Sequence, residues 1–285
     1  MKVPFTVNLK DQVALVTGGG GVLCSTMARA LATCGARIAV ADLKAEAAEA
    51  VAAAIRREGG AAISVACNVL EKDSLVAANE KVKQELGPVD ILINGAGGNH
   101  PKGTTSREYL RKEDLSGAGK DLISFYELDP KGIEFVFNLN FLGTLLPTQA
   151  FTRGMAAKGK GVVINISSMN AFRPLTKIPA YSGAKAAVSN FTQWLAVHFS
   201  KVGVRVNAIA PGFFVTDQNR ALLTQPDGTW TPRGNTILAH TPMGKFGAPE
   251  DLVGALLWLV SEEAAGFVTG VVVPIDGGFA AFSGV

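Results

Sequence analysis

The stretch Gln12-Val-Ala-Leu-Val-Thr-Gly-Gly-Gly-Gly21 decides the fold of this chain. Its first six residues form a short apolar run rich in β-branched side chains, which is typical of a buried strand. The run ends at four glycines, after which apolar residues between Met27 and Ala32 recur at helical spacing. The pattern predicts a strand, a glycine turn and a helix. Backbone without Cβ atoms can approach a pyrophosphate closely, and the N-terminus of a helix offers unpaired N–H groups.

A second apolar run, Arg37-Ile-Ala-Val-Ala41, ends on Asp42. Dinucleotide-binding folds carry an acid at this place, about 20 residues beyond the glycine turn, where it accepts hydrogen bonds from the ribose hydroxyls. Such an acid repels a 2′-phosphate, so Asp42 favours NAD over NADP, although Lys44 weakens this preference. A glycine-rich loop with an unrelated surface aspartate is the alternative interpretation.

The rest of the chain continues the alternation of strands and helices. This order is typical of a parallel sheet covered by helices. We therefore expect a Rossmann-like α/β fold, a doubly wound parallel sheet flanked by helices on both faces, in a single domain over residues 1–285. Further strands are expected at 63–69, 89–93, 161–166, 204–209 and 271–275, and helices at 44–58, 71–86, 134–157, 181–201 and 249–260.

Two segments interrupt the alternation. Residues 98–131 carry charges, glycines and turn residues with little apolar periodicity, and we interpret them as an insertion loop after a strand. A lid over the site and a mobile surface excursion both remain open for this loop. Residues 216–245 contain two proline turns, and we expect this second irregular segment to be a substrate loop that closes over a ligand.

Composition narrows the class of protein. With 285 residues, 48% of them hydrophobic, the chain can bury one large core. The 27 basic and 24 acidic residues are interspersed and leave a net charge of +3, so no nucleic-acid partner is expected. No apolar run approaches the roughly 18 residues of a membrane span, and the N-terminus lacks an apolar signal segment. We expect a cytoplasmic protein without a membrane partner.

The cysteines and histidines show no metal spacing. Cys24, Cys34 and Cys67 lack a C-x-x-C pattern, so we expect each to be a reduced, buried apolar side chain. The three histidines are scattered. No metal site is therefore expected.

Tyr181 and Lys185 lie four residues apart in a predicted helix, so their side chains share one face. A nearby cation favours the phenolate, and we expect Lys185 to bring the pKa of Tyr181 closer to neutral. The pair suits proton transfer, although for the two residues taken alone a plain surface pairing is the favoured interpretation. Ser168 follows a predicted strand, and Asn140 is a polar residue within an apolar helix that needs a partner or a function.

These residues, together with Thr17-Gly18, Asn94-Gly-Ala-Gly97 and Pro211-Gly212, resemble the short-chain dehydrogenase/reductase family. The resemblance covers residues 10–279, with the motifs in family order and spacing. It implies that Tyr181 is the general acid/base, Lys185 lowers its pKa and binds the nicotinamide ribose, Ser168 orients the substrate oxygen, and Asn140 holds a proton-relay water. The residues expected to bind the cofactor are Gly18, Gly20, Gly21, Val22, Leu23, Asp42, Asn68, Val69, Asn94, Ala96, Gly97, Tyr181, Lys185, Pro211, Gly212, Phe214 and Thr216.

Three features depart from the family pattern. The second and third glycines of T-G-x-x-x-G-x-G are Val22 and Cys24 here, and Gly19, Gly20 and Gly21 are the residues that can compensate. Asn68 stands where the family has an Asp near the adenine, and the insertion at 98–131 is long. At these positions the sequence resembles the short-chain type of D-mannonate oxidoreductase, also called fructuronate reductase. That resemblance implies the reaction D-mannonate + NAD ⇌ D-fructuronate + NADH.

Two other functions stay open. One is a dehydrogenase of another sugar acid or polyol, for example a gluconate-like substrate, and the other is a nucleotide-sensing protein that has lost catalysis. A sugar acid needs a cation for its carboxylate and polar groups for its hydroxyls. The candidates for these contacts are Asn99, His100, Lys102, Asn170, Arg173, Lys177 and Arg233, and a solvated loop residue is the alternative for each.

The family resemblance also implies a homo-oligomer, a dimer or a homotetramer, in which the helix of Tyr181 and its preceding neighbour pack against a second subunit. Apolar side chains that can form this surface lie in both predicted helices, and ordinary core packing is the alternative for them. They are Phe151, Phe191, Trp194, Leu195 and Phe199.

Overall fold

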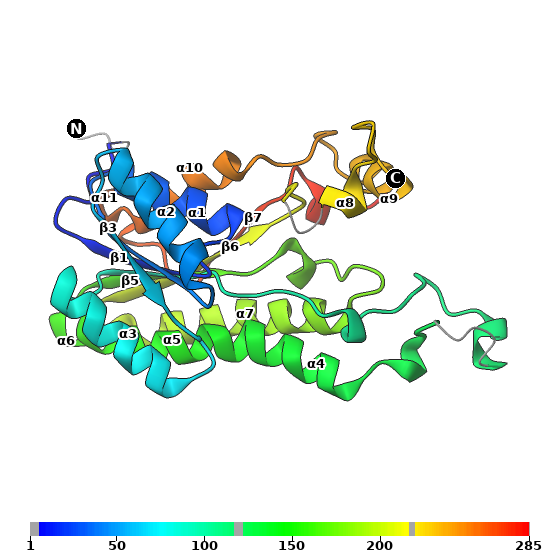
Figure 1. The fold of residues 1–285 in the computed structure, drawn as a ribbon, viewed down its shortest axis with the longest axis horizontal. Helices are drawn as coiled ribbons and strands as arrows, with labels where there is room; N and C mark the ends of the chain where they lie inside the picture. The colour runs from blue at the N-terminus through cyan, green and yellow to red at the C-terminus, as the bar shows by residue number, and fades with distance from the viewer. Residues whose placement is uncertain (1–5, 117–121, 217–219, 285) are drawn as a thin grey trace.

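A parallel sheet of seven strands forms the centre of the molecule in a computed structural model that describes residues 6–116, 122–216 and 220–284 (Figure 1). The strands lie in the order β3-β2-β1-β4-β5-β6-β7, so the direction of winding reverses between β1 and β4. A crevice at such a reversal is where doubly wound folds bind ligands. The strands are β1 (Val13–Thr17), β2 (Arg37–Asp42), β3 (Ala62–Ala66), β4 (Ile91–Asn94), β5 (Gly161–Ile166), β6 (Val204–Pro211) and β7 (Val272–Ile275).

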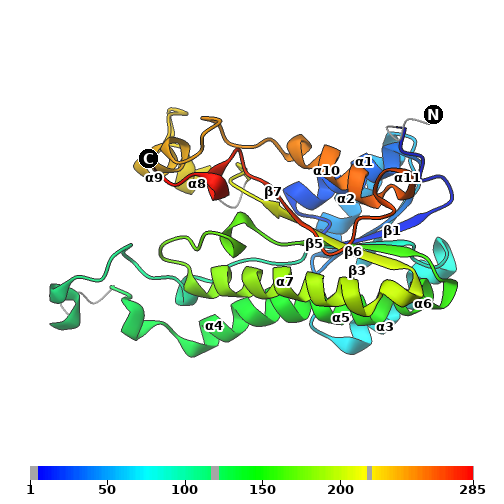
Figure 2. The same ribbon diagram turned by 180° about the vertical axis from the view of Figure 1, so that it is seen from behind.

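Helices cover both faces of the sheet (Figures 1 and 2). One face carries α1 (Val22–Thr33), α2 (Ala45–Arg57), α10 (Val253–Val260) and α11 (Glu262–Ala265). The other carries α3 (Lys72–Glu85), α4 (Pro130–Phe137), α5 (Gly143–Phe151), α6 (Arg153–Lys158) and α7 (Pro179–His198). The predicted α/β fold with its doubly wound sheet is confirmed.

The central strand shows why the sequence folds this way. Ala14 and Val16 of β1 pack against one helical layer, whereas Val13 and Leu15 pack against the other, and all four are fully buried. A strand buried on both faces needs a continuous apolar run, which is the pattern seen in the sequence.

The helix expected at 134–157 is not continuous. It begins earlier, at Pro130, because Asp129 caps it by accepting a hydrogen bond of 2.9 Å from the backbone N–H of Lys131. A π-helical turn at Asn138–Leu142 then separates α4 from α5, and a further break precedes α6. A π turn inserts one residue into a helix and is frequent at functional sites.

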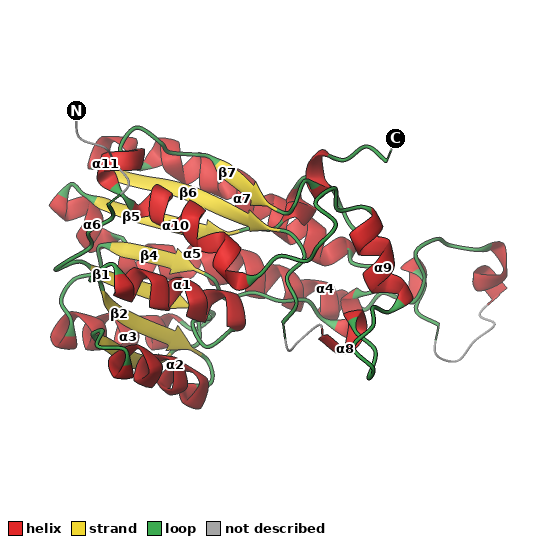
Figure 3. Cartoon of the chain, turned by 90° about the horizontal axis from the view of Figure 1, so that it is seen from above, coloured by secondary structure: helices red, strands yellow, loops and turns green. Residues whose placement is uncertain are grey.

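The insertion at 98–131 extends away from the sheet beyond the start of α4 (Figure 3). Its described part contains short 3-10 turns at Pro101–Gly103, Lys112–Ser116 and Phe125–Glu127. Arg107 and Asp114 form an ion pair of 2.6 Å within it. The second segment, expected to be irregular, instead contains the helices α8 (Arg220–Leu223) and α9 (Pro232–Ala239). Residues 117–121 and 217–219 of the two segments lie outside the described residues.

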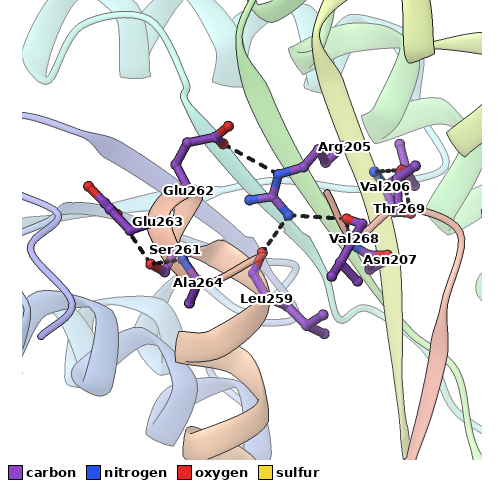
Figure 4. A network of polar contacts seen from close by, with 10 residues as sticks. All are labelled: Arg205, Val206, Asn207, Leu259, Ser261, Glu262, Glu263, Ala264, Val268 and Thr269. Atoms are coloured by element: carbon purple, nitrogen blue, oxygen red, sulfur yellow. Dashed lines mark hydrogen bonds and ion pairs between the residues drawn. The ribbon is translucent and has the colours of Figure 1, made fainter. Parts of the chain in front are cut away.

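Arg205 joins β6 to the end of α10 and the chain before β7, at the amino end of the strand (Figure 4). Its Nη1 donates to the carbonyl oxygen of Leu259 at 2.8 Å, and its Nε lies 3.4 Å from Oε2 of Glu262. Burial lowers the pKa of this guanidinium. The network holds the far end of the sheet, whereas the carboxyl ends of the strands are left for the site.

Candidate active site

A cavity of about 640 Å³, here the main cavity, opens at the carboxyl ends of the strands. It runs from the glycine turn after β1 to Tyr181 and Lys185 on α7, and every residue predicted to bind the cofactor lines it except Asn94. Asn94 is buried behind it, where its side-chain amide donates to Thr148 Oγ1 and Asn165 Oδ1, both at 2.9 Å. Asn94 therefore supports the site from the sheet and does not face the cavity.

The glycine turn leaves no room for side chains. Gly18 has a positive φ of 63°, and a Cβ atom there would lie 2.9 Å from the backbone nitrogen of Ala96. A Cβ atom at Gly20 would lie 2.6 Å from the Cβ of Ala47 and 3.0 Å from Asp42 Oδ2. Gly18 is the first glycine of the family pattern, and Gly20 is one of the three glycines that can compensate for the two missing ones. Gly21 precedes α1 without a side-chain cap, so the first turn of the helix meets the cavity with bare backbone, which suits a pyrophosphate.

The carboxylate of Asp42 is held at the edge of the main cavity. Its Oδ2 accepts from the N–H of Gly20 and its Oδ1 from the N–H of Lys44, each at 3.0 Å. The two bonds fix the orientation of the negative charge, and each oxygen keeps a second lone pair for a ribose hydroxyl. Asn68, beyond the end of β3, also lines the cavity.

Lys185 is 4% exposed, and its Nζ donates to the carbonyl oxygen of Ile166 at 2.8 Å. The same nitrogen lies 5.7 Å from the centre of the Tyr181 ring. Burial lowers the pKa of Lys185 to about 8. Lys185 is therefore poised between its charged and neutral forms near neutral pH.

The pKa of Tyr181 moves in the direction opposite to the expected one. Burial raises it, and the hydrogen bond with the Ser168 side chain offsets part of that rise. Lys185 does not contribute to the shift. By itself, the chain holds Tyr181 as a protonated phenol that can donate a proton.

Asn140 does not line the main cavity but supports its wall. It is fully buried in the π turn, and its Nδ2 donates to the carbonyl oxygens of Gly98 and Val136, both at 2.7 Å. Its Oδ1 accepts from the N–H of Gly98 at 3.2 Å, and a Cβ atom at Gly97 would lie 2.7 Å from that oxygen. Asn140 thus fixes the chain that faces Lys185. Its role in holding a water stays a prediction.

A second cavity of about 290 Å³, here the side cavity, meets the main cavity at Tyr181 and Ser168. Three of the predicted substrate residues line it, namely Asn99, Asn170 and Arg233. The remainder of its wall is mostly apolar. The apolar residues are Met169, Leu175, Ile178, Phe213, Leu222, Leu223 and Ile237.

Four other predicted substrate residues line neither cavity. The Nδ1 of His100 accepts from the N–H of Lys102 at 3.2 Å, and Lys102 pairs with Asp129. Arg173 is exposed and donates to the carbonyl oxygen of Ala280 at 3.1 Å. Lys177 occupies a backbone position with a φ of 71°. These residues have structural roles in loops, which their sequence neighbourhood did not reveal.

Several lining residues escaped the sequence analysis. Phe213 lines both cavities, and α8 and α9 supply Leu222, Leu223 and Ile237 to the apolar wall of the side cavity. Cys24 and Cys67 are buried as expected and line the main cavity, whereas Cys34 is only half-buried. Burial raises the pKa of Cys24 to about 12, so its thiol is neutral. Within the described residues, no helix is long and apolar enough to cross a membrane.

Comparison with known proteins agrees with this geometry. The family model for short chain dehydrogenases matches residues 12–227. An uncharacterised oxidoreductase from Haemophilus influenzae is 55% identical over 285 residues, which cover 100% of this chain and 99% of that protein. A Haemophilus crystal structure with bound NAD, provisionally named a D-mannonate oxidoreductase, is 56% identical with a TM-score of 0.92 over 98% of both chains.

A gluconate 5-dehydrogenase from Burkholderia cenocepacia, solved with NADP and tartrate, is 30% identical with a TM-score of 0.81. The alignment covers 97% of this chain and 98% of that one. The glycine turn, the Tyr181 and Lys185 pair beside Ser168, and these matches place the chain in the short-chain dehydrogenase/reductase family of oxidoreductases.

Proposed function

We propose that this protein interconverts a secondary alcohol of a sugar acid and the corresponding ketone with NAD, and that the pair is D-mannonate and D-fructuronate. One observation carries the proposal: Tyr181 and Ser168 stand where a cavity shaped for a dinucleotide meets a smaller cavity with polar groups. A substrate in the side cavity would present its reacting carbon at this junction. Gluconate-like acids and polyols are the alternative substrates.

The chemistry requires a hydride and a proton to leave the substrate. In the oxidative direction the alcohol would give a hydride to NAD and its hydroxyl proton to the phenolate form of Tyr181, which would yield the ketone, NADH and the protonated phenol. Ser168 holds the substrate oxygen. Lys185, when its amine is protonated, supplies positive charge beside the Tyr181 ring. In the reductive direction the raised pKa of Tyr181 suits a phenol that holds its proton until the alkoxide forms.

Asp42 supports a preference for NAD. Its fixed carboxylate would accept hydrogen bonds from the adenosine ribose and repel a 2′-phosphate. The Haemophilus structure contains NAD, whereas the Burkholderia structure contains NADP. The name of the Haemophilus structure supports D-mannonate as the first substrate to test.

A substrate panel tests the proposal. The purified protein is mixed with NAD and one of several aldonic acids or hexitols, and formation of NADH is followed. We expect the highest kcat/KM for D-mannonate, because unpaired polar groups in a pocket penalise a wrong sugar. A higher value for a gluconate-like acid would transfer the assignment to the alternative. Binding of NAD without turnover of any substrate would favour a nucleotide-sensing protein.

We also propose that the protein is a homo-oligomer. Trp194 on α7 is 55% exposed and stacks on Phe191 beside a groove between α5 and α7. Phe151 is buried in the core and does not line this groove, whereas Leu195, although buried, forms part of its lining. Light scattering should show a dimer or tetramer that Trp194→Lys dissociates and Trp258→Lys, on the other helical layer, does not. A wild-type monomer would contradict the proposal.

A cytoplasmic location completes the proposal. The three cysteines are all unpaired, which suits a reducing compartment. Cell fractionation with a tagged chain tests this, and recovery outside the cytoplasm would contradict it.

A further inference from the structure

Asn170 carries a buried polar atom that the protein leaves without a partner. The residue is 5% exposed, lines the side cavity, and its Oδ1 has no hydrogen bond within the described structure. Buried polar groups are nearly always paired, so an orphan in a cavity wall points to a ligand group. The neighbouring wall residues Met169 and Leu223 are apolar and only 2% exposed, and they offer no side-chain donor.

The backbone holds Asn170 close to the reacting atoms. Ser168, the proposed partner of the substrate oxygen, begins a 3-10 turn at Met169–Ala171, and its Oγ accepts from the N–H of Asn170 at 3.3 Å. The N–H of Ala171 donates to the carbonyl oxygen of Ser168 at 3.0 Å. This tight turn keeps Asn170 next to Ser168. Because both residues line the side cavity, the Asn170 amide would meet a substrate atom near the reacting carbon.

Arg233 enters the side cavity from a different element. It lies in the first turn of α9 and is the only charged side chain among the described residues that line this cavity. A guanidinium binds a carboxylate with two parallel hydrogen bonds. The side cavity thus joins an amide beside the reacting centre to a cation on α9, with an apolar wall between them.

We propose that Asn170 and Arg233 determine substrate specificity: the amide of Asn170 binds the hydroxyl on the carbon next to the reacting one, and Arg233 binds the carboxylate. This inference rests on the proposed sugar-acid function and specifies how the acid is recognised. A hydroxyl both donates and accepts, so it satisfies the Asn170 amide in either orientation. A substrate without that hydroxyl would leave the buried amide unpaired, which a pocket built for hydrogen bonding rejects strongly.

A cycle of enzyme variants and substrates tests the role of Asn170. Wild-type protein and Asn170→Leu, which keeps the size but removes the amide, are assayed with the preferred sugar acid and with its deoxy analogue lacking the neighbouring hydroxyl. We expect wild type to prefer the hydroxylated acid by about 100-fold or more, and Asn170→Leu to reduce this preference to within about tenfold. Asn170→Ser, which restores a polar group, should recover part of the preference.

Arg233 is tested in the same way with a pair of substrates that differ in charge. We expect Arg233→Leu to raise KM for the sugar acid by about 10- to 100-fold, the loss of one charged hydrogen-bonded pair, and to raise KM for the corresponding hexitol by a much smaller factor. Asn235→Leu on the same helix, outside the lining of either cavity, is the control and should leave both values unchanged. Titration with NAD, monitored by tryptophan fluorescence, shows whether each variant is folded and binds the cofactor.

The outcomes separate the two claims. If wild type oxidises no sugar acid, the proposed function fails and the inference falls with it. If wild type is active but Asn170→Leu loses activity equally on the acid and the deoxy analogue, Asn170 only supports the fold and the inference alone is overturned. Equal effects of Arg233→Leu on the acid and the hexitol would remove Arg233 from carboxylate binding.

Discussion

The sulfur of Cys24 fills the space that a side chain at Gly95 would need. A Cβ atom built at Gly95 meets Cys24 Sγ and also lies 2.7 Å from the carbonyl oxygen of Thr17. The family pattern has a glycine at position 24, where this chain has the larger residue Cys24 on α1. The residue that its sulfur contacts in the cavity wall, Gly95, has no side chain and so leaves room for the sulfur. The two positions form one packing unit at the floor of the main cavity.

Gly95→Ala should therefore destabilise the protein. Overpacking of this kind costs about 1–3 kcal/mol. Cys24→Gly added to Gly95→Ala should restore part of the loss, because it removes the sulfur but not the contact with Thr17. A double-mutant cycle by chemical denaturation measures this coupling, and strictly additive effects would show that the two sites are independent.

Tyr181→Phe should lower kcat by about 10²- to 10⁴-fold, the range for loss of a general acid/base. Binding of NAD should remain, because the change removes only one oxygen from a residue at the end of the main cavity. Steady-state kinetics and NAD titration check both results. Tyr126→Phe, an exposed tyrosine in the insertion, is the matched control. A variant that keeps wild-type turnover would remove Tyr181 from proton transfer.

Lys185 should make stability rise with pH. Burial lowers its pKa from 10.5 to about 8, so between these values the unfolded chain holds a proton that the folded chain has released. Below pH 8 the buried lysine is charged, and the whole cost of burying that charge lowers the free energy of unfolding. As the pH rises from 8 toward 10.5, the folded chain no longer carries this charge and the free energy of unfolding increases. At about 1.4 kcal/mol per pKa unit, the relief is on the order of 3 kcal/mol.

The measurement compares wild type with Lys185→Met in the absence of NAD. The free energy of unfolding of wild type, relative to the variant, should increase between pH 7 and 10 by an amount of this order. Lys201→Met, at an exposed lysine, should show no such difference from wild type. A relative stability that is flat or falls over this range would contradict the assigned pKa direction.

Asp42→Asn should shift the cofactor preference toward NADP. The amide keeps an acceptor oxygen for one of the two backbone N–H groups but loses the charge that repels a 2′-phosphate. Loss of charged hydrogen bonding to the ribose should lower the ratio of kcat/KM for NAD over NADP by about 10- to 100-fold. The same ratio for Asp73→Asn, on α3, should equal that of wild type. An unchanged ratio in Asp42→Asn would assign cofactor choice to other residues.

Much of the fold follows from local sequence patterns. The central strands β1, β4 and β5 are buried throughout and are mostly apolar runs, and glycine or proline marks the chain at the ends of β1, β4, β6 and β7. The edge strands β3 and β7 are partly exposed. The main cavity was predictable for the same reason, because most of its lining residues directly follow strands of the sheet. The π turn at Asn140 was not, since it depends on contacts with Gly98, 42 residues away.

The proposed substrate residues were harder to identify because they lie in loops and short helices. Asn170 reaches the side cavity through the turn after Ser168, and Arg233 reaches it through the position of α9. The residues next to them in the sequence do not distinguish these two from His100 or Arg173, which line neither cavity. The predicted direction of the Tyr181 pKa shift was wrong for another reason. Residue spacing shows which charge is near, but not how deeply both groups are buried.

The π turn at Asn140 also sets the phase of the helical layer. One extra residue advances a helix by about 100°, so α4 and α5 turn different sides toward α7. Phe137, before the midpoint, faces Gly183, and Phe141, after it, packs edge to face on Phe191. Deleting one residue from Asn138–Leu142 should therefore restore α-helical spacing and rotate α4 about its axis relative to α5 by about 100°.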